Sequence, residues 1–402
     1  MTPRLKEAVA AIEPRVVDWR RRIHRSPELA FQEKATAALV EEQLRTLDLD
    51  AVQPGLGTTG VAALLRGSGS VGANRRVLLL RADMDALPIA EQTSLDFAST
   101  NAGVMHACGH DAHTAILLGV AHVLSMMRAE LSTDVLFMFQ PAEEAGLGAR
   151  RMLDDGLFEV ARPEVAYMLH VWHDLEAGVL AVPTGPVMAG ALMFEIIVNG
   201  RGGHAARPQL ALDPVVTSAH IVAMLQTVVS REMDPSQPVV LTIGSIQAGE
   251  APNVIPDTAR ILGTARAYDR EILRVVQRRI EEVATTTAAA LRLSATVQFA
   301  AAIPPVINDG AAASNAVEAI RGELGSEAVG EVGPSMGSED FAFVLDEVPG
   351  SMIRLGVRSP LWHEARPIHT ATFDLDEQAL RSGVIALSAI ALRHGSRAIP
   401  PR

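Results

Sequence analysis

The sequence lacks three things: a second cysteine, a surplus of basic residues and a long apolar run. Cys108 is the only cysteine among 402 residues, so the chain cannot form an internal disulfide and we expect a reducing compartment, the cytoplasm. The formal net charge of −12 argues against a nucleic-acid or acidic-membrane partner. Membrane spans and signal peptides need apolar segments that we do not find here.

What is present indicates a globular protein of two domains. Hydrophobic residues make up 48% of the chain and charged residues 20%, which is typical of a well-packed protein. A length of 402 residues exceeds one ordinary core and predicts two domains.

The order of the predicted elements places one domain inside the other. Residues 1–185 and 302–402 alternate between helices and buried strands, which predicts one discontinuous α/β domain. Between them, residues 186–301 follow the order strand-helix-strand-strand-helix-strand. This is the split βαβ, ferredoxin-like arrangement, and it predicts a complete α+β domain inserted in the chain.

Acidic residues or histidines accompany three strands of the predicted larger domain. The segments are 76–81 with Asp83 and Asp85, 134–140 with Glu143 and Glu144, and 167–173 with His170 and His173. Open α/β sheets bind their ligands at the carboxyl ends of strands. Taken singly, Asp83 and Asp85 could be turn formers, and adjacent glutamates usually lie on a surface. Their recurrence predicts that these side chains converge on one metal site.

The nine residues 105–113, MHACGHDAH, hold the only cysteine and three of the twelve histidines. Cys108 and His110, two positions apart on a turn or strand end, can point at one spot. Thiolate and imidazole together are a favoured ligand set for a transition metal. A buried free cysteine near a polar helix start is the alternative interpretation. The acidic residues and histidines of the neighbouring predicted strands favour the interpretation as a metal site.

Eight motifs in order resemble a known family. They are RADMDALP (81–88), MHACGHDAH (105–113), QPAEEAG (140–146), LHVW (169–172), GRGGHAARP (200–208), NVIPD (253–257), GTARAYD (263–269) and MGSEDF (336–341). The chain is similar to the co-catalytic metallo-amidohydrolase and peptidase family. The branch it resembles contains hippurate hydrolases, indole-acetyl-amino-acid hydrolases and N-acyl-L-amino-acid amidohydrolases. The resemblance extends from His24 to His369.

The resemblance implies an aminopeptidase-like catalytic domain with a mixed sheet and two divalent metal ions, Zn²⁺, Mn²⁺, Co²⁺ or Ni²⁺. The implied ligands are Cys108 as the bridge, His110, Glu144, His170 and His369. Asp83 stands where relatives carry a histidine ligand, so we expect the Cys108/His110 arrangement to replace that ligand. Asp85 is expected to hydrogen-bond to a ligand, and His173 to line the pocket.

The resemblance also implies the reaction, hydrolysis of N-acyl-L-amino acids to a carboxylic acid and a free amino acid. A metal pair lowers the pKa of a bound water to about 7 and polarises the carbonyl. Neighbouring glutamates leave the chain in different directions, so Glu144 can bind metal while Glu143 acts as general base and then general acid. A dipeptidase or carboxypeptidase is the alternative within this class. A binding protein without activity is the alternative outside it, but it would not need Glu143.

The inserted domain is expected to be a lid and dimerisation domain, which implies a homodimer or higher homo-oligomer. His204, on a Gly-rich loop, would stabilise the oxyanion in its own or a partner's site. Asn253 and Arg266 would hold the carboxylate of the substrate. A surface histidine and an ordinary ion pair are the alternatives for His204 and Arg266.

Overall fold

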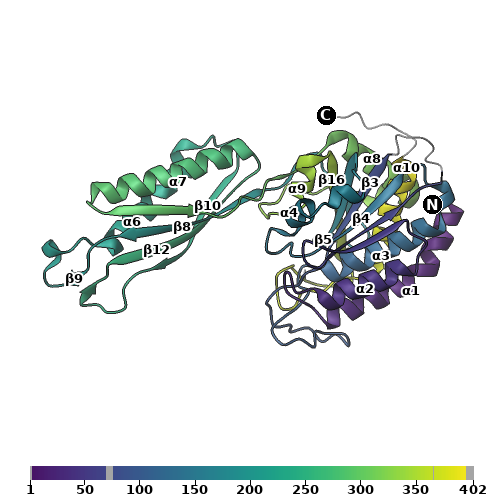
Figure 1. Ribbon diagram of the computed structural model, residues 1–402, viewed down its shortest axis with the longest axis horizontal. Helices are drawn as coiled ribbons and strands as arrows, with labels where there is room; N and C mark the ends of the chain where they lie inside the picture. Colours follow the sequence, from purple (N-terminus) through teal and green to yellow (C-terminus); the bar gives the residue numbers. More distant parts are fainter. Residues whose placement is uncertain (1, 69–75, 365, 395–402) are drawn as a thin grey trace. The chain divides into compact units, whose positions relative to one another are not determined.

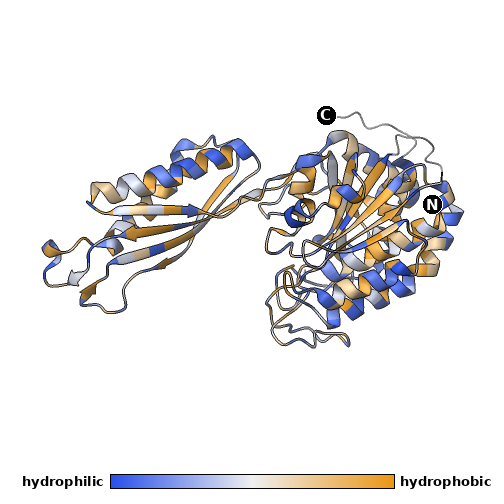
Figure 2. Ribbon diagram, viewed as in Figure 1, coloured by the Kyte–Doolittle hydropathy of each residue, from blue (hydrophilic) through white to orange (hydrophobic). Residues whose placement is uncertain are grey.

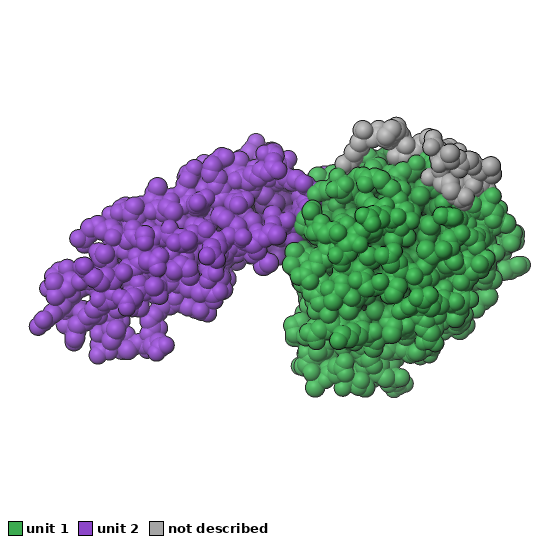
Figure 3. All heavy atoms as spheres, in the orientation of Figure 1, with its two compact units in different colours: residues 1–185, 307–333, 340–402 green, residues 186–306, 334–339 purple. Residues whose placement is uncertain are grey.

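The computed structural model describes residues 2–68, 76–364 and 366–394 (Figure 1). The chain divides into two compact units (Figure 3). Unit 1 comprises Met1–Gly185, Ile307–Gly333 and Asp340–Arg402, and unit 2 comprises Pro186–Val306 and Pro334–Glu339. The predicted inserted domain, 186–301, lies within unit 2. Unit 2 also takes in 302–306 and 334–339, which the sequence assigns to the larger domain. Residues 395–402, at the end of that predicted domain, lie outside the described residues.

Unit 1 is built on an eight-stranded mixed sheet in the order β1-β2-β4-β3-β5-β16-β6-β15, which confirms the predicted α/β class. The strands are β1 (Ala51–Leu56), β2 (Gly60–Leu65), β3 (Val77–Asp83), β4 (Asp134–Gln140), β5 (Val165–Glu176), β6 (Leu180–Ala181), β15 (Val329–Gly330) and β16 (Gly350–Arg358). β3 runs parallel to β4 and β5, and β5 runs parallel to β16. Every residue of β2, β3 and β4 is buried, which explains why these strands are apolar rather than alternating.

Helices cover this sheet. They are α1 (Pro3–Arg25), α2 (Lys34–Arg45), α3 (His110–Met126), α4 (Gly148–Asp154), α5 (Leu157–Val160), α8 (Gly310–Leu324), α9 (Ala342–Glu347) and α10 (Gln378–His394). α3 is buried at every residue up to Leu124 and packs against α1 and α10. Figure 2 shows hydrophobic residues along the central strands and many polar residues on α2. None of the described helices is long and apolar enough to cross a membrane.

Unit 2 has a four-stranded antiparallel sheet with its own core. Its strands are β8 (Gly190–Asn199), β10 (Val239–Gln247), β12 (Thr258–Ala267) and β13 (Ser294–Phe299), in the order β10-β12-β8-β13, and its helices are α6 (Pro214–Thr227) and α7 (Arg270–Ala290). Asp213 and Asp269 cap the two helices by accepting backbone N–H bonds. A further pair of short strands in unit 2 is β9 (Gly203–His204) with β11 (Val254–Ile255). β7 (Gly185–Met188) pairs with β14 (Val306–Asn308), and the boundary between the two units falls within both of these strands. The chain order and strand order are ferredoxin-like.

The largest local difference from the prediction concerns the start of α3. The sequence analysis puts Cys108 and His110 on a turn or strand end, but His110 is the first residue of the helix. Gly109 makes the early start possible: its φ is 83°, and a Cβ there would lie 2.5 Å from Val171 Cγ2. His110 and His113 therefore stand on one rigid helix. A second difference is that β5 continues to Glu176 instead of ending in histidine.

Candidate metal centre

The side chains expected to bind metal meet at one edge of the unit 1 sheet. β3 ends at Asp83, β4 ends at Gln140 just before the 141–146 loop, and His170 lies in β5. Because these strands are parallel, their carboxyl ends share an edge. The loop carrying His369 is attached there by the His369 N–H, which donates to the carbonyl of Ala107 at 2.7 Å.

Two groups of ligand atoms share Cys108. Cys108, His110 and His170 offer atoms within 4.8 Å of one another, and so do Cys108, Glu144 and His369. The sulfur lies 3.6 Å from His170 Nε2 and 3.3 Å from His369 Nε2. His369 Nε2 is also 3.3 Å from Glu144 Oε1. The set would therefore give each of two cations three protein ligands, with the thiolate common to both.

The orientation of the histidines fits metal binding. His170 Nδ1 lies 2.7 Å from the carbonyl of Val171, so Nδ1 carries the proton and Nε2 keeps its lone pair toward Cys108. His110 Nδ1 lies 3.2 Å from Asp85 Oδ1, and its Nε2 is buried without a hydrogen-bond partner among the described residues. An oxygen acceptor on one nitrogen that leaves the other free for the metal is typical of metal-ligating histidines.

The histidines of the two groups differ in how their surroundings shift the pKa. Hydrogen bonds with Cys108 and Glu144 raise the pKa of His369 to about 10. Burial disfavours the charged form of His110, but Asp83 and Cys108 outweigh it and raise the His110 pKa well above its usual value. Burial also raises the pKa of the Cys108 thiol. Burial, by contrast, lowers the pKa of His170 well below its usual value, so this ring is a neutral ligand, whereas Cys108, His110 and His369 would release their protons when a divalent cation binds.

Asp83 and His113 lie beside the two ligand groups without belonging to either. Their atoms also lie within 4.8 Å of His110. However, His113 Nδ1 is 2.6 Å from Asp83 Oδ1, and its Nε2 accepts the Val171 N–H at 2.9 Å, so both ring nitrogens are engaged. Asp83 Oδ2 pairs with Arg81 Nη1 at 2.6 Å. These bonds connect β3 to β5 beside His170 rather than leaving a ligand atom open.

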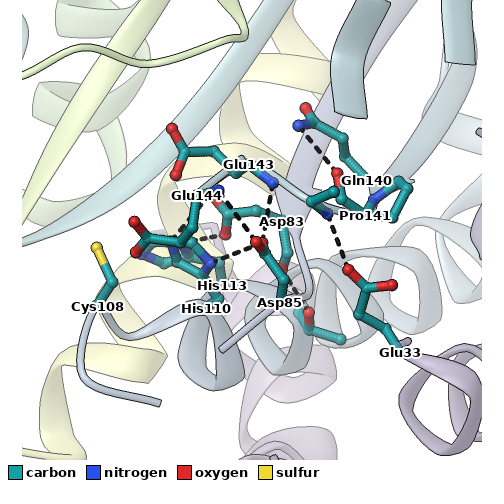
Figure 4. A network of polar contacts seen from close by, with 12 residues as sticks. Glu33, Asp83, Asp85, Cys108, His110, His113, Gln140, Pro141, Glu143 and Glu144 are labelled. Atoms are coloured by element: carbon teal, nitrogen blue, oxygen red, sulfur yellow. Dashed lines mark hydrogen bonds and ion pairs between the residues drawn. The ribbon is translucent and has the colours of Figure 1, made fainter. Parts of the chain in front are cut away.

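Asp85 orients three groups at once. Its buried carboxylate accepts the N–H of Glu143 on Oδ1 and that of Glu144 on Oδ2, each at 3.0 Å, and contacts His110. Figure 4 shows Glu144 turned toward Cys108 and Glu143 directed elsewhere. A ligand atom of Glu143 lies within 4.8 Å of those of His110 and Glu144, so a further carboxylate, which belongs to neither of the two groups around Cys108, stands beside them. His173 lies farther along β5, 3.4 Å from Asp174 and outside these groups.

His204, Asn253 and Arg266 belong to unit 2. His204 is exposed on β9, and its Nδ1 accepts the Ala206 N–H at 3.1 Å, so Nε2 carries a proton that can be donated. Asn253 is exposed just before β11, which pairs with β9. Arg266 lies near the far end of β12 from this pair, roughly 25 Å along the strand by the usual rise per residue. The structure brings His204 and Asn253 together but not Asn253 and Arg266.

Arg266 is bound within its own unit. Nη1 donates to the carbonyl of Met336 at 3.0 Å and to Ser338 Oγ at 3.4 Å. This contact was not predicted from the sequence. Nor was the role of Arg81, whose buried guanidinium contacts Asp83, Gln140 and Asp340. The available signal was a basic residue in an otherwise apolar strand, since a buried charge needs partners.

Comparisons with known proteins decide the family. Residues 79–393 match the model of a protein family described as Peptidase family M20/M25/M40. The chain belongs to this family. An N-acetylcysteine deacetylase of Bacillus subtilis is 40% identical over 376 residues, 92% of this chain and 94% of that protein. Thermostable carboxypeptidase 1 of Saccharolobus solfataricus is 34% identical over 400 residues, 99% of this chain and 100% of that protein.

The fold agrees with a solved M20 structure. A dinuclear metal-binding M20 peptidase of Bacillus subtilis has a TM-score of 0.82 and 34% identity, covering 96% of this chain and 99% of the other. The family predicted from the eight motifs is therefore confirmed, and the chain is a hydrolase acting on amide bonds. The paired ligand groups around Cys108 are consistent with the dinuclear metal binding of this M20 relative.

Proposed function

We propose that this M20 protein hydrolyses N-acyl-L-amino acids, using two divalent metal ions held by Cys108, His110, Glu144, His170 and His369. The observation that carries the proposal is the pair of ligand groups sharing Cys108, with Glu143 beside them and outside both. A binding protein would need the ligands but not this additional carboxylate. The deacetylase relative supports an acyl-amino-acid substrate.

When bound, the two cations supply Lewis acidity and a more acidic water molecule. Glu143 takes a proton from the attacking water and delivers it to the departing amide nitrogen. Asp85 holds the backbone of Glu143 and the ring of His110, so base and ligand keep a fixed separation. His369 is half-exposed, which leaves the centre open to substrate on its side.

A second copy of the chain completes the site in this proposal. Within one unit 2, Asn253 and Arg266 are too far apart to hold the same carboxylate, so joint use of both requires two chains. His204 would donate from Nε2 to the oxyanion in the neighbour's site. Exposed apolar residues on α6 support a homodimer through this unit, namely Val215, Val216 and Met224 at 45%, 50% and 48% exposure. The buried thiol serves as a ligand only while reduced, so we place the reaction in the cytoplasm.

The carboxypeptidase relative favours one second candidate, removal of a C-terminal amino acid from a peptide. The same metal ligands, the same general base and the same carboxylate-binding residues, Asn253 and Arg266, would serve this reaction. The two functions differ on the acyl side of the scissile bond, where one accepts a simple acyl group and the other a peptide.

The test is a substrate screen with the purified protein loaded with Mn²⁺ or Zn²⁺. N-acetyl, N-benzoyl and indole-acetyl amino acids are compared with dipeptides and longer peptides, and Glu143→Gln serves as the control. Hydrolysis of acyl amino acids that the control lacks would support the proposal. Preferential cleavage of peptides would favour the carboxypeptidase. A protein with both metals bound and no amidase activity on any of these would contradict both.

A further inference from the structure

Glu33 is a buried carboxylate that neither ligand group uses. Glu33 is 0% exposed. It occupies the N-cap position of α2, but its side chain does not cap that helix. Glu28 does the capping instead, accepting the N–H of Ala35 at 3.0 Å and of Thr36 at 2.9 Å. A buried charge without a role in its own helix needs another explanation.

The Glu33 side chain connects three separate segments. Oε1 accepts the Ala142 N–H and the Phe31 N–H, each at 2.9 Å, and Oε2 accepts the hydroxyl of Thr59. Figure 4 shows Glu33 reaching the loop that follows Pro141. Hydrogen bonds to a charged acceptor are stronger than neutral ones. Glu33 therefore ties the entrance of α2 and the start of β2 to the loop that carries Glu143.

The backbone around Glu33 is strained at three places. In the described residues, five non-glycine residues have positive φ, and three of them flank Glu33: Phe31 at 63°, Thr58 at 90° and Ala142 at 52°. Phe31 and Ala142 are themselves its donors, and Thr58 precedes the third donor. Non-glycine residues remain in this region only where their surroundings hold them. The Glu33 carboxylate is bonded to two of these residues and to the chain neighbour of the third.

The strain bears on the general base because Ala142 precedes Glu143. The N–H groups of 142, 143 and 144 are held in succession by two buried carboxylates, first Glu33 and then Asp85. If the Ala142 bond were lost, its φ could relax to a negative value and turn the following peptide. Because the Ala142–Glu143 peptide carries the N–H that binds Asp85 Oδ1, that rotation would break this bond and move the Glu143 side chain, whereas the next N–H, that of Glu144, would keep its separate bond to Asp85 Oδ2.

We propose that Glu33 is a positioning residue that holds Ala142 in its left-handed conformation and so fixes the direction of Glu143 toward the centre. This inference rests on the role proposed above for Glu143. It separates the functions of the two buried carboxylates: Asp85 orients ligand and base together, and Glu33 orients the base alone.

The kinetic test compares Glu33→Ala with Glu28→Ala. Both remove a carboxylate from the same segment that accepts backbone N–H bonds, but only Glu33 touches the loop. Glu33→Ala should keep both metals and its KM while kcat falls by about 100-fold, a loss that a misplacement of about 1 Å can cause. Glu28→Ala should lose thermal stability without a selective loss of kcat. Unchanged kcat in Glu33→Ala, or an equal loss in Glu28→Ala, would overturn the proposal, as would loss of metal.

Two conservative variants sharpen the result. Glu33→Asp keeps the charge, but its side chain is one methylene shorter and does not reach the Ala142 N–H. This variant should therefore resemble Glu33→Ala. Glu33→Gln can direct its carbonyl at Ala142 and Phe31 and its NH₂ at Thr59, whose hydroxyl can turn to accept it. Glu33→Gln should therefore retain most activity. The opposite ranking, with Asp active and Gln inactive, would mean that charge rather than positioning is needed and would overturn the proposal.

A second readout does not depend on the substrate. Backbone hydrogen exchange of a peptide covering 141–146 should quicken in Glu33→Ala but not in Glu28→Ala, with β16 unchanged in both. Unaltered exchange would overturn the inference even if kcat fell. If the wild-type protein cleaves no acyl amino acid or peptide, the proposed function fails, and the exchange measurement still decides whether Glu33 fixes the loop.

Discussion

Apart from the half-exposed His369 of unit 1 and the hydrogen-bonded Arg266 of unit 2, the two units hold their functional residues in opposite ways. In unit 1, Asp83, Asp85 and His110 are at most 1% exposed, and each has a polar partner. In unit 2, His204 and Asn253 are exposed. Burying polar groups requires fixed partners, so the unit 1 arrangement is organised before any ligand arrives. Exposed side chains carry no such requirement and can gain a partner later. Substitutions in the two units should therefore differ in kind as well as in size.

The largest effect is expected for Cys108→Ser, which removes the soft ligand common to both groups. Most bound metal and activity should be lost while the fold is retained, because the sheet and α3 do not depend on the thiol. Elemental analysis, circular dichroism and the substrate assay measure the three quantities. An active Cys108→Ser protein with full metal occupancy would show that Cys108 is not the bridge.

Glu143→Gln should leave the metals in place and slow the reaction. General acid–base catalysis contributes about 10²–10⁴-fold, so a loss below about tenfold would assign the base elsewhere. Metal content and KM should stay near the wild-type values, because Glu143 lies outside both ligand groups. Glu144→Gln is the matched neighbour, and it should lose metal as well as activity.

The contrast between the units also explains what the sequence could and could not predict. Strand 134–140 was predicted with its observed bounds, and the convergence of Asp83, Glu144 and His170 followed from parallel strands sharing an edge. The start of α3 was not predictable, because it depends on the left-handed Gly109 packed on Val171. Glu33 gave no periodic signal, since its partners come from residues far along the chain. The placement of Arg266 against 336–338 is long-range for the same reason.

His204→Ala should reduce kcat by about 10²–10³-fold, the usual cost of losing one oxyanion donor, without loss of metal. Mixing His204→Ala with Glu143→Ala, with subunit exchange allowed, tests where the imidazole acts. If it acts in the partner's site, each mixed dimer has one site with both defects and one with neither, so activity returns. Verified heterodimers that stay inactive would assign His204 to its own chain.

Arg266→Ala should raise KM for substrates with a free carboxylate and change kcat little. A hydrogen bond to a charged group contributes about 1.5–3 kcal/mol, which predicts a rise of about tenfold or more. Amidated substrates provide the control, because they have no carboxylate for Arg266 to bind. Equal cleavage of amidated and free substrates by the wild-type protein would show that Arg266 has a different role, such as holding 336–338 in unit 2.

The smallest expected effect compares a part-buried glutamate–histidine pair in unit 1 with an exposed glutamate–arginine pair in unit 2. His24 contacts Asp111 through Nδ1 at 2.8 Å and Glu91 through Nε2 at 3.3 Å, so both ring nitrogens face carboxylates. Burial disfavours the charged ring, but Asp111 and Glu91 outweigh it and raise the pKa of His24. Burial alone would raise the pKa of Glu91, but hydrogen bonds from His24 and Thr93 prevail and lower it to about 2. In unit 2, Glu232 pairs with Arg279 on the surface, at 2.6 Å and 3.0 Å.

The pH dependence follows from these directions. A carboxylate with a lowered folded pKa stabilises the protein above its unfolded value, here 4.5, and loses that contribution as the pH falls toward about 2. The His24 pKa is raised, so its contribution is present below 6.5 and disappears as the pH rises through the folded value. The pair should therefore contribute most between these two values. Glu91→Gln should lower the denaturation midpoint in that window and converge with the wild-type protein near pH 2, whereas Glu232→Gln should follow the wild-type curve throughout, because water and salt screen an exposed pair. Parallel curves for Glu91→Gln and the wild-type protein across the whole range would show that burial in unit 1 does not set the strength of this pair.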